Sequence, residues 1–199
     1  MRERSYRPGR VSVLKAVPDL DPASRLPGVR FAASPNADDR PDGAVVELIV
    51  VHAISLPPER FGGSYIEALF TNRLDVDAHP YFRSIADLRV SAHFLIGRSG
   101  NLVQFVECNR RAWHAGVSTW RGRERCNDFS IGIELEGCDT RRFAPAQYEM
   151  LAQLVDRICA RYPIADIVGH SDIAPGRKTD PGPHFDWLRF HRRLSLLPA

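Results

Sequence analysis

Val46-Glu47-Leu48-Ile49-Val50-Val51-His52 is a nearly continuous apolar run that ends in a histidine. Its β-branched residues predict a buried strand. A second short apolar segment, residues 164–168, is followed directly by Gly169-His170. Ligand sites in α/β sheets gather where strands end. His52 and His170 are therefore candidates for a ligand site at the sheet.

Two further stretches predict strands. Residues 90–97 and 101–107 flank Arg98-Ser99-Gly100, which is typical of a β-hairpin with glycine at its turn. Residues 129–137 alternate, with Ile131, Ile133 and Leu135 on one face and Gly132, Glu134 and Glu136 on the other. Residues 108–128 show no clear period, and a long connection of this kind within a compact domain is usually a binding loop.

Helical patterns alternate with these strands. Ser64 and Glu67 have capping-box spacing and predict a helix over 64–74. Pro145 begins another helix, which Pro163 ends. Its apolar stripe consists of Tyr148, Leu151, Ala152, Val155, Ile158 and Cys159. Short helices are expected near 80–87 and 185–194. This order predicts a single α/β domain with a central mixed sheet, mostly antiparallel, that helices cover.

The composition limits the class of protein. The chain has 199 residues, of which 44% are hydrophobic and 26% charged, as expected for one globular domain. The net charge of +3 is small, and no basic stripe carries interleaved aromatic residues, so no nucleic-acid partner is predicted. No apolar run is long enough to span a membrane, and no membrane partner is expected.

The ends of the chain and its cysteines suggest a cellular location. Residues 1–27 are rich in proline and arginine and predict a poorly ordered N-terminal arm, while 193–199 form a C-terminal tail. No apolar segment follows the basic start, so no secretory signal is predicted. The four cysteines are far apart and form no CxxC pair, which favours reduced thiols in the cytoplasm.

Three side chains form a possible metal set. His52, His170 and Asp180 offer two imidazoles and a carboxylate, which suits zinc and leaves a fourth position for water. Their spacing is not a motif in itself, and ordinary polar loop residues explain it as well. Glu134 and Glu136 share a face, so alternation does not tell which is a general base, or whether both are solvated. Lys178 is either a surface lysine or a cation that holds an oxyanion.

Other polar residues also have two interpretations. His93 lies in mid-strand, where a hydrogen-bonded core or wall residue is expected. His114, beside Trp113, either stacks against a sugar ring or packs on the sheet. Arg89 and Arg125 either clamp substrate carboxylates or are solvated surface residues.

Four longer blocks resemble a known family. They are VVHAISLPPERFGG (50–63), LRVSAHFLIGRSG (88–100), RAWHAGVSTWRGRERCNDFSIGIELEG (111–137) and GHSDIAPGRKTDPGPHFDW (169–187). Together they resemble the type 2 N-acetylmuramoyl-L-alanine amidases, a family that includes phage lysozyme-type amidases and peptidoglycan recognition proteins. The resemblance covers residues 28–192 and implies one amidase domain there.

The resemblance implies a role for each candidate. His52, His170 and Asp180 match the zinc ligands, with one Zn²⁺ per chain. Glu134, not Glu136, matches the catalytic glutamate, and Lys178 matches the catalytic lysine. The implied substrate-binding residues are Arg89, Arg125, Trp113 and His114.

The resemblance also implies a reaction. It is strongest to cytoplasmic members that cleave the amide between 1,6-anhydro-N-acetylmuramyl and L-alanine, which recycles wall fragments and keeps β-lactamase induction low. The expected partner is an anhydro-muropeptide, and the expected state is a monomer. Two alternatives remain: a muropeptide sensor without catalysis, which the presence of Asp180 disfavours, and a secreted wall hydrolase, which the lack of an apolar N-terminal segment disfavours.

Overall fold

The computed structural model describes residues 17–197. Within them, a central sheet of six strands has the order β1-β5-β4-β9-β3-β10. The strands are β1 (Arg30–Phe31), β3 (Leu48–Ile54), β4 (Phe94–Ile96), β5 (Leu102–Gln104), β9 (Ser130–Glu136) and β10 (Asp166–Gly169). The expected α/β class, with a mixed central sheet covered by helices, is confirmed.

The sheet is mostly parallel, and the expectation of a mostly antiparallel sheet was wrong. Among the strands described, only the predicted β4–β5 hairpin gives an antiparallel neighbour pair in this sheet. Strand β9 runs parallel to both β3 and β4, and β10 runs parallel to β3. A short turn permits antiparallel pairing, whereas the long connections between the other strands bring the chain back to the same end of the sheet.

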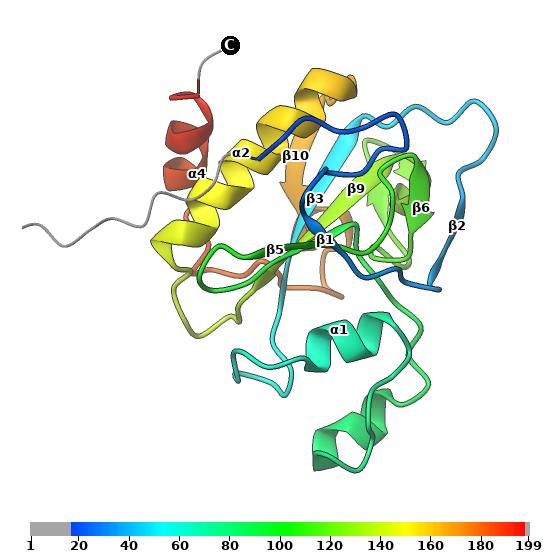
Figure 1. Cartoon of the computed structure of the whole chain (residues 1–199), viewed down its shortest axis with the longest axis vertical. Coiled ribbons are helices and arrows are strands. Elements are labelled where there is room, and N and C mark those ends of the chain that lie inside the picture. Colours follow the sequence, from blue (N-terminus) through cyan, green and yellow to red (C-terminus); the bar gives the residue numbers. More distant parts are fainter. Residues whose placement is uncertain (1–16, 198–199) are drawn as a thin grey trace, which may run out of the picture.

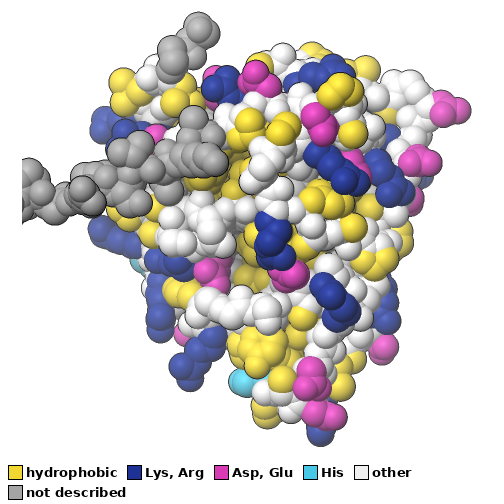
Figure 2. Space-filling view, in the orientation of Figure 1, with side chains coloured by type: hydrophobic (Ala, Val, Ile, Leu, Met, Phe, Trp, Pro, Cys, Tyr) yellow, Lys and Arg dark blue, Asp and Glu magenta, His cyan; other side chains and the backbone are white. Residues whose placement is uncertain are grey.

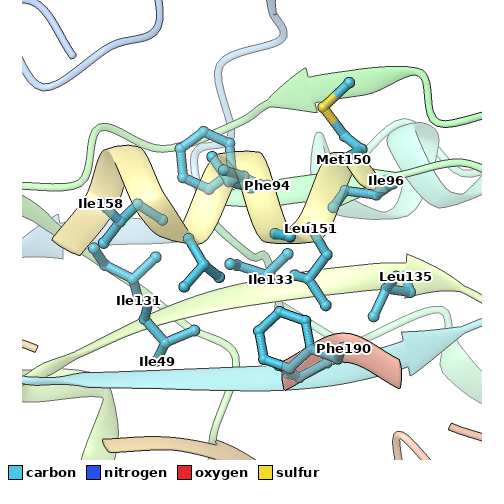
Figure 3. Packing of buried hydrophobic residues seen from close by; sticks show 14 of the residues in the cluster. Ile49, Phe94, Ile96, Ile131, Ile133, Leu135, Met150, Leu151, Ile158 and Phe190 are labelled. Atoms are coloured by element: carbon cyan, nitrogen blue, oxygen red, sulfur yellow. The ribbon is translucent and has the colours of Figure 1, made fainter. Parts of the chain in front are cut away.

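Two helices cover one face of the sheet. Helix α2 (Pro145–Arg161) begins at the predicted proline, and α4 (Trp187–Leu194) packs beside it (Figure 1). Figure 3 shows α2 side chains over Ile131 and Ile133 of β9, with Phe190 of α4 nearby. Cys159, expected in the apolar stripe of α2, is exposed instead.

The other face of the sheet is covered by shorter elements. They are β2 (Ala37–Asp39), α1 (Tyr65–Phe70), the 3-10 turn η1 (Pro80–Ile85), β6 (Arg110–Ala112), β7 (Thr119–Trp120), β8 (Arg123–Glu124), η2 (Cys126–Asp128) and α3 (His170–Ile173). Residues 108–128 were expected to lack regular structure, but they contain β6, β7 and β8. Strand β6 pairs with β2, far away in sequence, so no local pattern indicates it.

The capping box predicted for α1 does not form. Ser64 is the N-cap residue, but its side chain makes no capping hydrogen bond. Glu67 instead forms an ion pair with Arg30, because a cation attracts the carboxylate more strongly than a neutral backbone N–H does. The helix is also shorter than predicted, since it ends at Phe70.

Part of the predicted N-terminal arm is packed against the domain. Residues 1–16 lie outside the described part of the chain. Val17 and Leu26 are buried, and the Ser24 hydroxyl accepts a hydrogen bond from Tyr162 at 2.8 Å. Gln104 of β5 accepts a bond from the backbone of Leu26 at 2.9 Å. Residues 17–27 are therefore not the loose segment that was expected.

The surface carries mixed charges. On the face shown in Figure 2, basic and acidic side chains are interspersed rather than gathered in one patch. None of the helices within residues 17–197 combines the length and apolar composition that crossing a membrane requires.

Candidate active site

Strand alternation brings a histidine and a glutamate to one face of the sheet. His52 on β3 pairs in register with Glu134 on β9, and Val50 pairs with Gly132. In a parallel pair, partners in register point to the same side. Ile131 and Ile133 share one face, as predicted, and this face packs against α2, while His52 and Glu134 face away from it.

Three side chains converge near the carboxyl ends of β3 and β10. The distances are 3.0 Å from His52 Nδ1 to His170 Nδ1, 3.2 Å from His52 Nδ1 to Asp180 Oδ2, and 3.1 Å from His170 Nδ1 to Asp180 Oδ2. His170 follows β10 directly. The loop after it brings Asp180 back beside His170. That loop packs tightly, because a Cβ on Gly169 would lie 2.8 Å from Pro181 Cδ.

The donor set and its spacing fit a zinc ion. Zinc binds two histidine nitrogens and a carboxylate oxygen at about 2.0–2.2 Å, so tetrahedral ligand atoms lie about 3.3–3.5 Å apart. The three atoms here are nearly that far apart and nearly equidistant. Burial lowers the pKa of His52 to about 4, which keeps the imidazole neutral, the form that binds metal.

Asp180 is held as an anion. Burial raises its pKa, but the adjacent side chains of His170 and His52 outweigh burial and lower the pKa below the usual range of an aspartate. The site thus presents the neutral imidazole of His52 beside one carboxylate. This charge state is the one that a divalent cation requires of its ligands.

Glu134 is buried beside this cluster, and one of its carboxyl oxygens is fully buried without a partner in the described part of the chain. The residue is 9% exposed, and Glu134 Oε2 has no hydrogen-bond partner among the residues described. Burial, and then the charge of Asp180, raise the pKa of Glu134 well above its usual value, and Lys178 opposes them. A buried carboxyl group with a raised pKa is suited to exchange protons with a bound substrate.

Glu136, the other glutamate on this face, is bonded on both oxygens. Its Oε1 accepts a hydrogen bond from the Gly62 backbone at 2.5 Å, and its Oε2 accepts one from the Arg98 backbone at 3.2 Å. These bonds tie two loops to the end of β9. The geometry therefore gives Glu134 a free oxygen and gives Glu136 a structural position.

A cleft of about 680 Å³ opens over the cluster. Most of the predicted site residues line it, namely His52, Arg89, Trp113, His114, Glu134, His170, Lys178 and Asp180. Arg89 and Lys178 are exposed at its edge. Arg125 is not among the lining residues; its side chain is 69% exposed and its Nε lies 3.2 Å from Asp128 Oδ2. Asn127, two residues further on, does line the cleft.

His114 and His93 are both buried, although His114 also lines the cleft. His114 is buried, and its Nδ1 lies 2.9 Å from His52 Nε2. The expectation of a hydrogen-bonded core residue is confirmed for His93, since it is fully buried, accepts a bond from the Gly132 backbone and lies 3.0 Å from the Arg110 carbonyl oxygen.

Sequence reasoning missed four residues that support the site. Asn127 Oδ1 accepts hydrogen bonds from the backbones of His114 and Ala115 at 3.1 and 2.8 Å. Arg177 donates to the Ala115 carbonyl oxygen at 2.7 Å. Ser130 and Gly132 contact the His114 ring from β9. A glycine inside a buried strand signals a close approach, and this signal was available in the sequence.

Comparison with known proteins agrees with this site. Residues 42–183 match the family described as N-acetylmuramoyl-L-alanine amidase. The 1,6-anhydro-N-acetylmuramyl-L-alanine amidase AmpD of Salmonella typhimurium strain SL1344 is 59% identical over 169 residues, which cover 84% of this chain and 90% of that protein. A crystal structure of a selenomethionine AmpD derivative is 57% identical, with a TM-score of 0.85, over 88% of this chain and 98% of that one.

A substrate complex of a more distant relative is also known. The amidase AmiD from Escherichia coli, in complex with the substrate anhydro-N-acetylmuramic acid-L-Ala-D-gamma-Glu-L-Lys, is 32% identical, with a TM-score of 0.56. The match covers 77% of this chain and 60% of AmiD.

The chain therefore belongs to the N-acetylmuramoyl-L-alanine amidase family, hydrolases that act on peptidoglycan material. Within this family it is similar to AmpD over most of its length, which confirms the resemblance found in the sequence.

Proposed function

We propose that this protein is a zinc amidase that hydrolyses the bond between 1,6-anhydro-N-acetylmuramic acid and the L-alanine of muropeptides. The observation that carries the proposal is the convergence of His52, His170 and Asp180 beside the unpartnered oxygen of Glu134. The substrate class is supported by the similarity to AmpD and by the anhydro-muropeptide bound to AmiD.

His52, His170 and Asp180 would hold the zinc ion. When bound there, zinc would supply Lewis-acid polarisation of the scissile carbonyl and a stronger water nucleophile at neutral pH. Glu134 takes the proton that the attacking water loses, and donates it to the alanine nitrogen as the C–N bond breaks. Its raised pKa suits the donating step. Lys178 stabilises the negative charge that develops on the carbonyl oxygen.

The substrate peptide is held by cations at the edge of the cleft. Muropeptide stems carry carboxylates, and an arginine can bind a carboxylate through two hydrogen bonds. We assign this role to Arg89, which lines the cleft, and to Arg125, which must leave Asp128 to reach it. Trp113 contacts the sugar or the peptide from the cleft wall. His114 is only partly accessible there.

The place of action is part of the proposal. Hydrolysis of imported anhydro-muropeptides in the cytoplasm frees the sugar and the peptide for recycling, and lowers β-lactamase induction where that circuit exists. All four cysteines lie in the described part of the chain and are free, as expected for a reducing compartment. Separating the cytoplasm and periplasm of the source cells tests the location.

Peptide release tests the reaction. Purified protein is analysed for metal, stripped with a chelator, reloaded with zinc and incubated with anhydro-muramyl tripeptide. Mass spectrometry should show the anhydro sugar and the free tripeptide, whose summed mass exceeds that of the substrate by one water. The chelated protein should release neither. Substrate that binds but stays intact in the zinc-loaded sample would instead indicate a sensor.

The arginine assignments have their own test. Arg89→Ala should raise KM about tenfold with little change in kcat, because it removes binding that ground state and transition state share. Arg125→Ala should do the same if its side chain turns into the cleft. Arg121→Ala is a matched control, because Arg121 is exposed on the same loop and pairs with Asp166, away from the cleft. A KM for Arg125→Ala equal to the control value would remove Arg125 from the site.

A further inference from the structure

The segment Trp113-His114-Ala115 passes directly behind the two histidines of the metal cluster. His114 Nδ1 lies 2.9 Å from His52 Nε2, and the Ala115 carbonyl oxygen lies 3.1 Å from His170 Nε2. We propose that His114 is a positioning residue that fixes the tautomer of His52, so that the lone pair of His52 Nδ1 faces the metal. This inference rests on the proposed zinc site.

A chain of hydrogen bonds runs from His52 through His114 and Ser130 to the Cys126 carbonyl oxygen, and this last member sets its direction. The Cys126 carbonyl oxygen can only accept, so the Ser130 hydroxyl donates to it, at 2.5 Å. The Ser130 oxygen then accepts from His114 Nε2, at 3.2 Å. His114 Nδ1 therefore carries no proton and accepts from His52 Nε2. With its proton on Nε2, His52 has a free lone pair on Nδ1, the atom that points at His170 and Asp180.

Strand β9 is shaped to hold this ring. A Cβ on Gly132 would lie 2.4–2.7 Å from atoms of the His114 imidazole, so only glycine leaves room for the ring against the strand. Ser130 and Gly132 are on the same strand face as Glu134. The strand that presents the proposed base thus also supports the partner of a metal ligand. Asn127 fixes the segment from the other side through the backbone N–H groups of His114 and Ala115.

His170 is oriented by the same segment. The Ala115 carbonyl oxygen can only accept, so His170 carries its proton on Nε2 and turns the lone pair of Nδ1 toward the cluster. Arg177 donates to the same carbonyl oxygen and to that of Val117, which fixes the loop. One short segment therefore selects the ligand atom of both histidines, by a side chain for His52 and by the backbone for His170.

Zinc affinity tests the role of His114. His114→Phe keeps a flat ring on Gly132 but has no acceptor, and should weaken zinc binding about 10–100-fold, as measured by competition with a chelator. His114→Asn places its amide oxygen close to the position of Nδ1 and should restore affinity to within a few-fold of the original protein. Val50→Ala is the control, because Val50 is buried beside Gly132 on the same face and makes no hydrogen bond to a ligand. It should loosen the core and leave zinc affinity unchanged.

Nitrogen NMR of the histidine rings gives a readout that does not need zinc. In the metal-free protein, His52 should carry its proton on Nε2. In the Phe variant, the two tautomers of His52 should be mixed. A proton on Nδ1 of His52 in the original protein would overturn the proposal, whether or not the variants fold.

Other results of these experiments would also contradict the proposal. Equal zinc affinity in the original protein and a folded His114→Phe variant overturns the role of His114. Equal losses in folded Phe and Asn variants do so too, since the acceptor is then not what matters. If the original protein binds no zinc at all, the proposed function fails. The tautomer of His52, measured without metal, then tests the hydrogen-bond chain separately.

Discussion

The two faces of the central sheet are built from the same strands but hold together by different means. On the face toward α2, Ile49, Ile131 and Ile133 pack in an apolar core that Figure 3 shows under the helix. On the opposite face, the neighbouring positions carry His52, Gly132 and Glu134. The two-residue period of a strand therefore places the candidate site residues on one face only, next to buried apolar residues such as Val50, and leaves the opposite face wholly apolar.

The covers of the two faces differ in the same way. Helix α2 is held by buried apolar side chains such as Leu151 and Ile158. The cover of the cleft face has an apolar cluster of its own, with Phe70 and Phe82 packed against Leu95 of β4, and it is also held by polar side chains that bind backbone. Arg40, for example, donates to the carbonyl oxygens of Asn127, Cys108 and Ser130. Hydrogen bonds fix atoms in defined directions, whereas apolar packing supplies most of the free energy of folding.

The largest effect is expected when a metal ligand is removed from the cleft face. His52→Ala should lose zinc and lower the rate of peptide release at least about 10³-fold, because a metal ion supplies several kcal/mol to such a reaction. The apolar face is untouched, so the variant should remain folded. Metal analysis, the release assay and circular dichroism check these three points. Zinc binding and turnover at the original level would contradict the ligand assignment.

Loss of the proposed base should come next. Glu134→Gln should retain zinc and lower kcat about 10²–10⁴-fold, because general acid–base catalysis is lost. Stability should not fall, since Glu134 Oε2 has no partner to lose. Glu136→Gln is the matched control on the same face, and should lower stability more than kcat because it weakens bonds to Gly62 and Arg98. A kcat loss in Glu136→Gln but not in Glu134→Gln would make Glu136 the base and Glu134 the structural residue.

A substitution on the apolar face should lower stability and leave zinc binding and kcat nearly unchanged, the opposite of the substitutions on the cleft face. Ile131→Ala should lower the free energy of unfolding by about 2–5 kcal/mol, because it leaves a cavity under α2. Zinc affinity and kcat of the folded protein should stay within about twofold of the original. Urea unfolding and chelator competition on the same sample measure both quantities. If kcat fell as far as in Glu134→Gln, the two faces would not be separable.

The sequence predicted well the residues whose role depends on strand period. The apolar run that ends at His52 and the alternation around Ile131 need only local information, and both are confirmed. Alternation alone did not choose between Glu134 and Glu136, because they share a face. The family resemblance made that choice, and the unpartnered oxygen of Glu134 supports it.

The sequence predicted poorly whatever depends on distant partners. Strand β6 exists because β2 pairs with it. The capping box at Ser64 does not form because Glu67 pairs with Arg30, which is remote in sequence. The position of His114 is a further case. A histidine beside a tryptophan in a long loop suggests a substrate contact, and only the folded chain brings it to His52.

The smallest expected effect concerns the charges that hold the cleft-side cover. Arg111 on β6 donates two hydrogen bonds of 2.6 Å to Asp38 on β2. Arg111 holds the pKa of Asp38 below its usual value, against the effect of burial. A lowered folded-state pKa means that this stabilisation is complete above about pH 4, the ordinary pKa of aspartate, and is lost as the pH falls further.

Asp38→Asn should therefore cost no more than about 1 kcal/mol at pH 7, because the Asp38 side chain is 41% exposed and solvent screens the pair. The difference from the original protein should shrink in urea unfolding at pH 3. Asp39→Asn is the control, since the Asp39 side chain is 93% exposed and should contribute nothing measurable. A loss of several kcal/mol in Asp38→Asn that persists at pH 3 would mean that the cover depends on shape rather than charge, as the α2 face does.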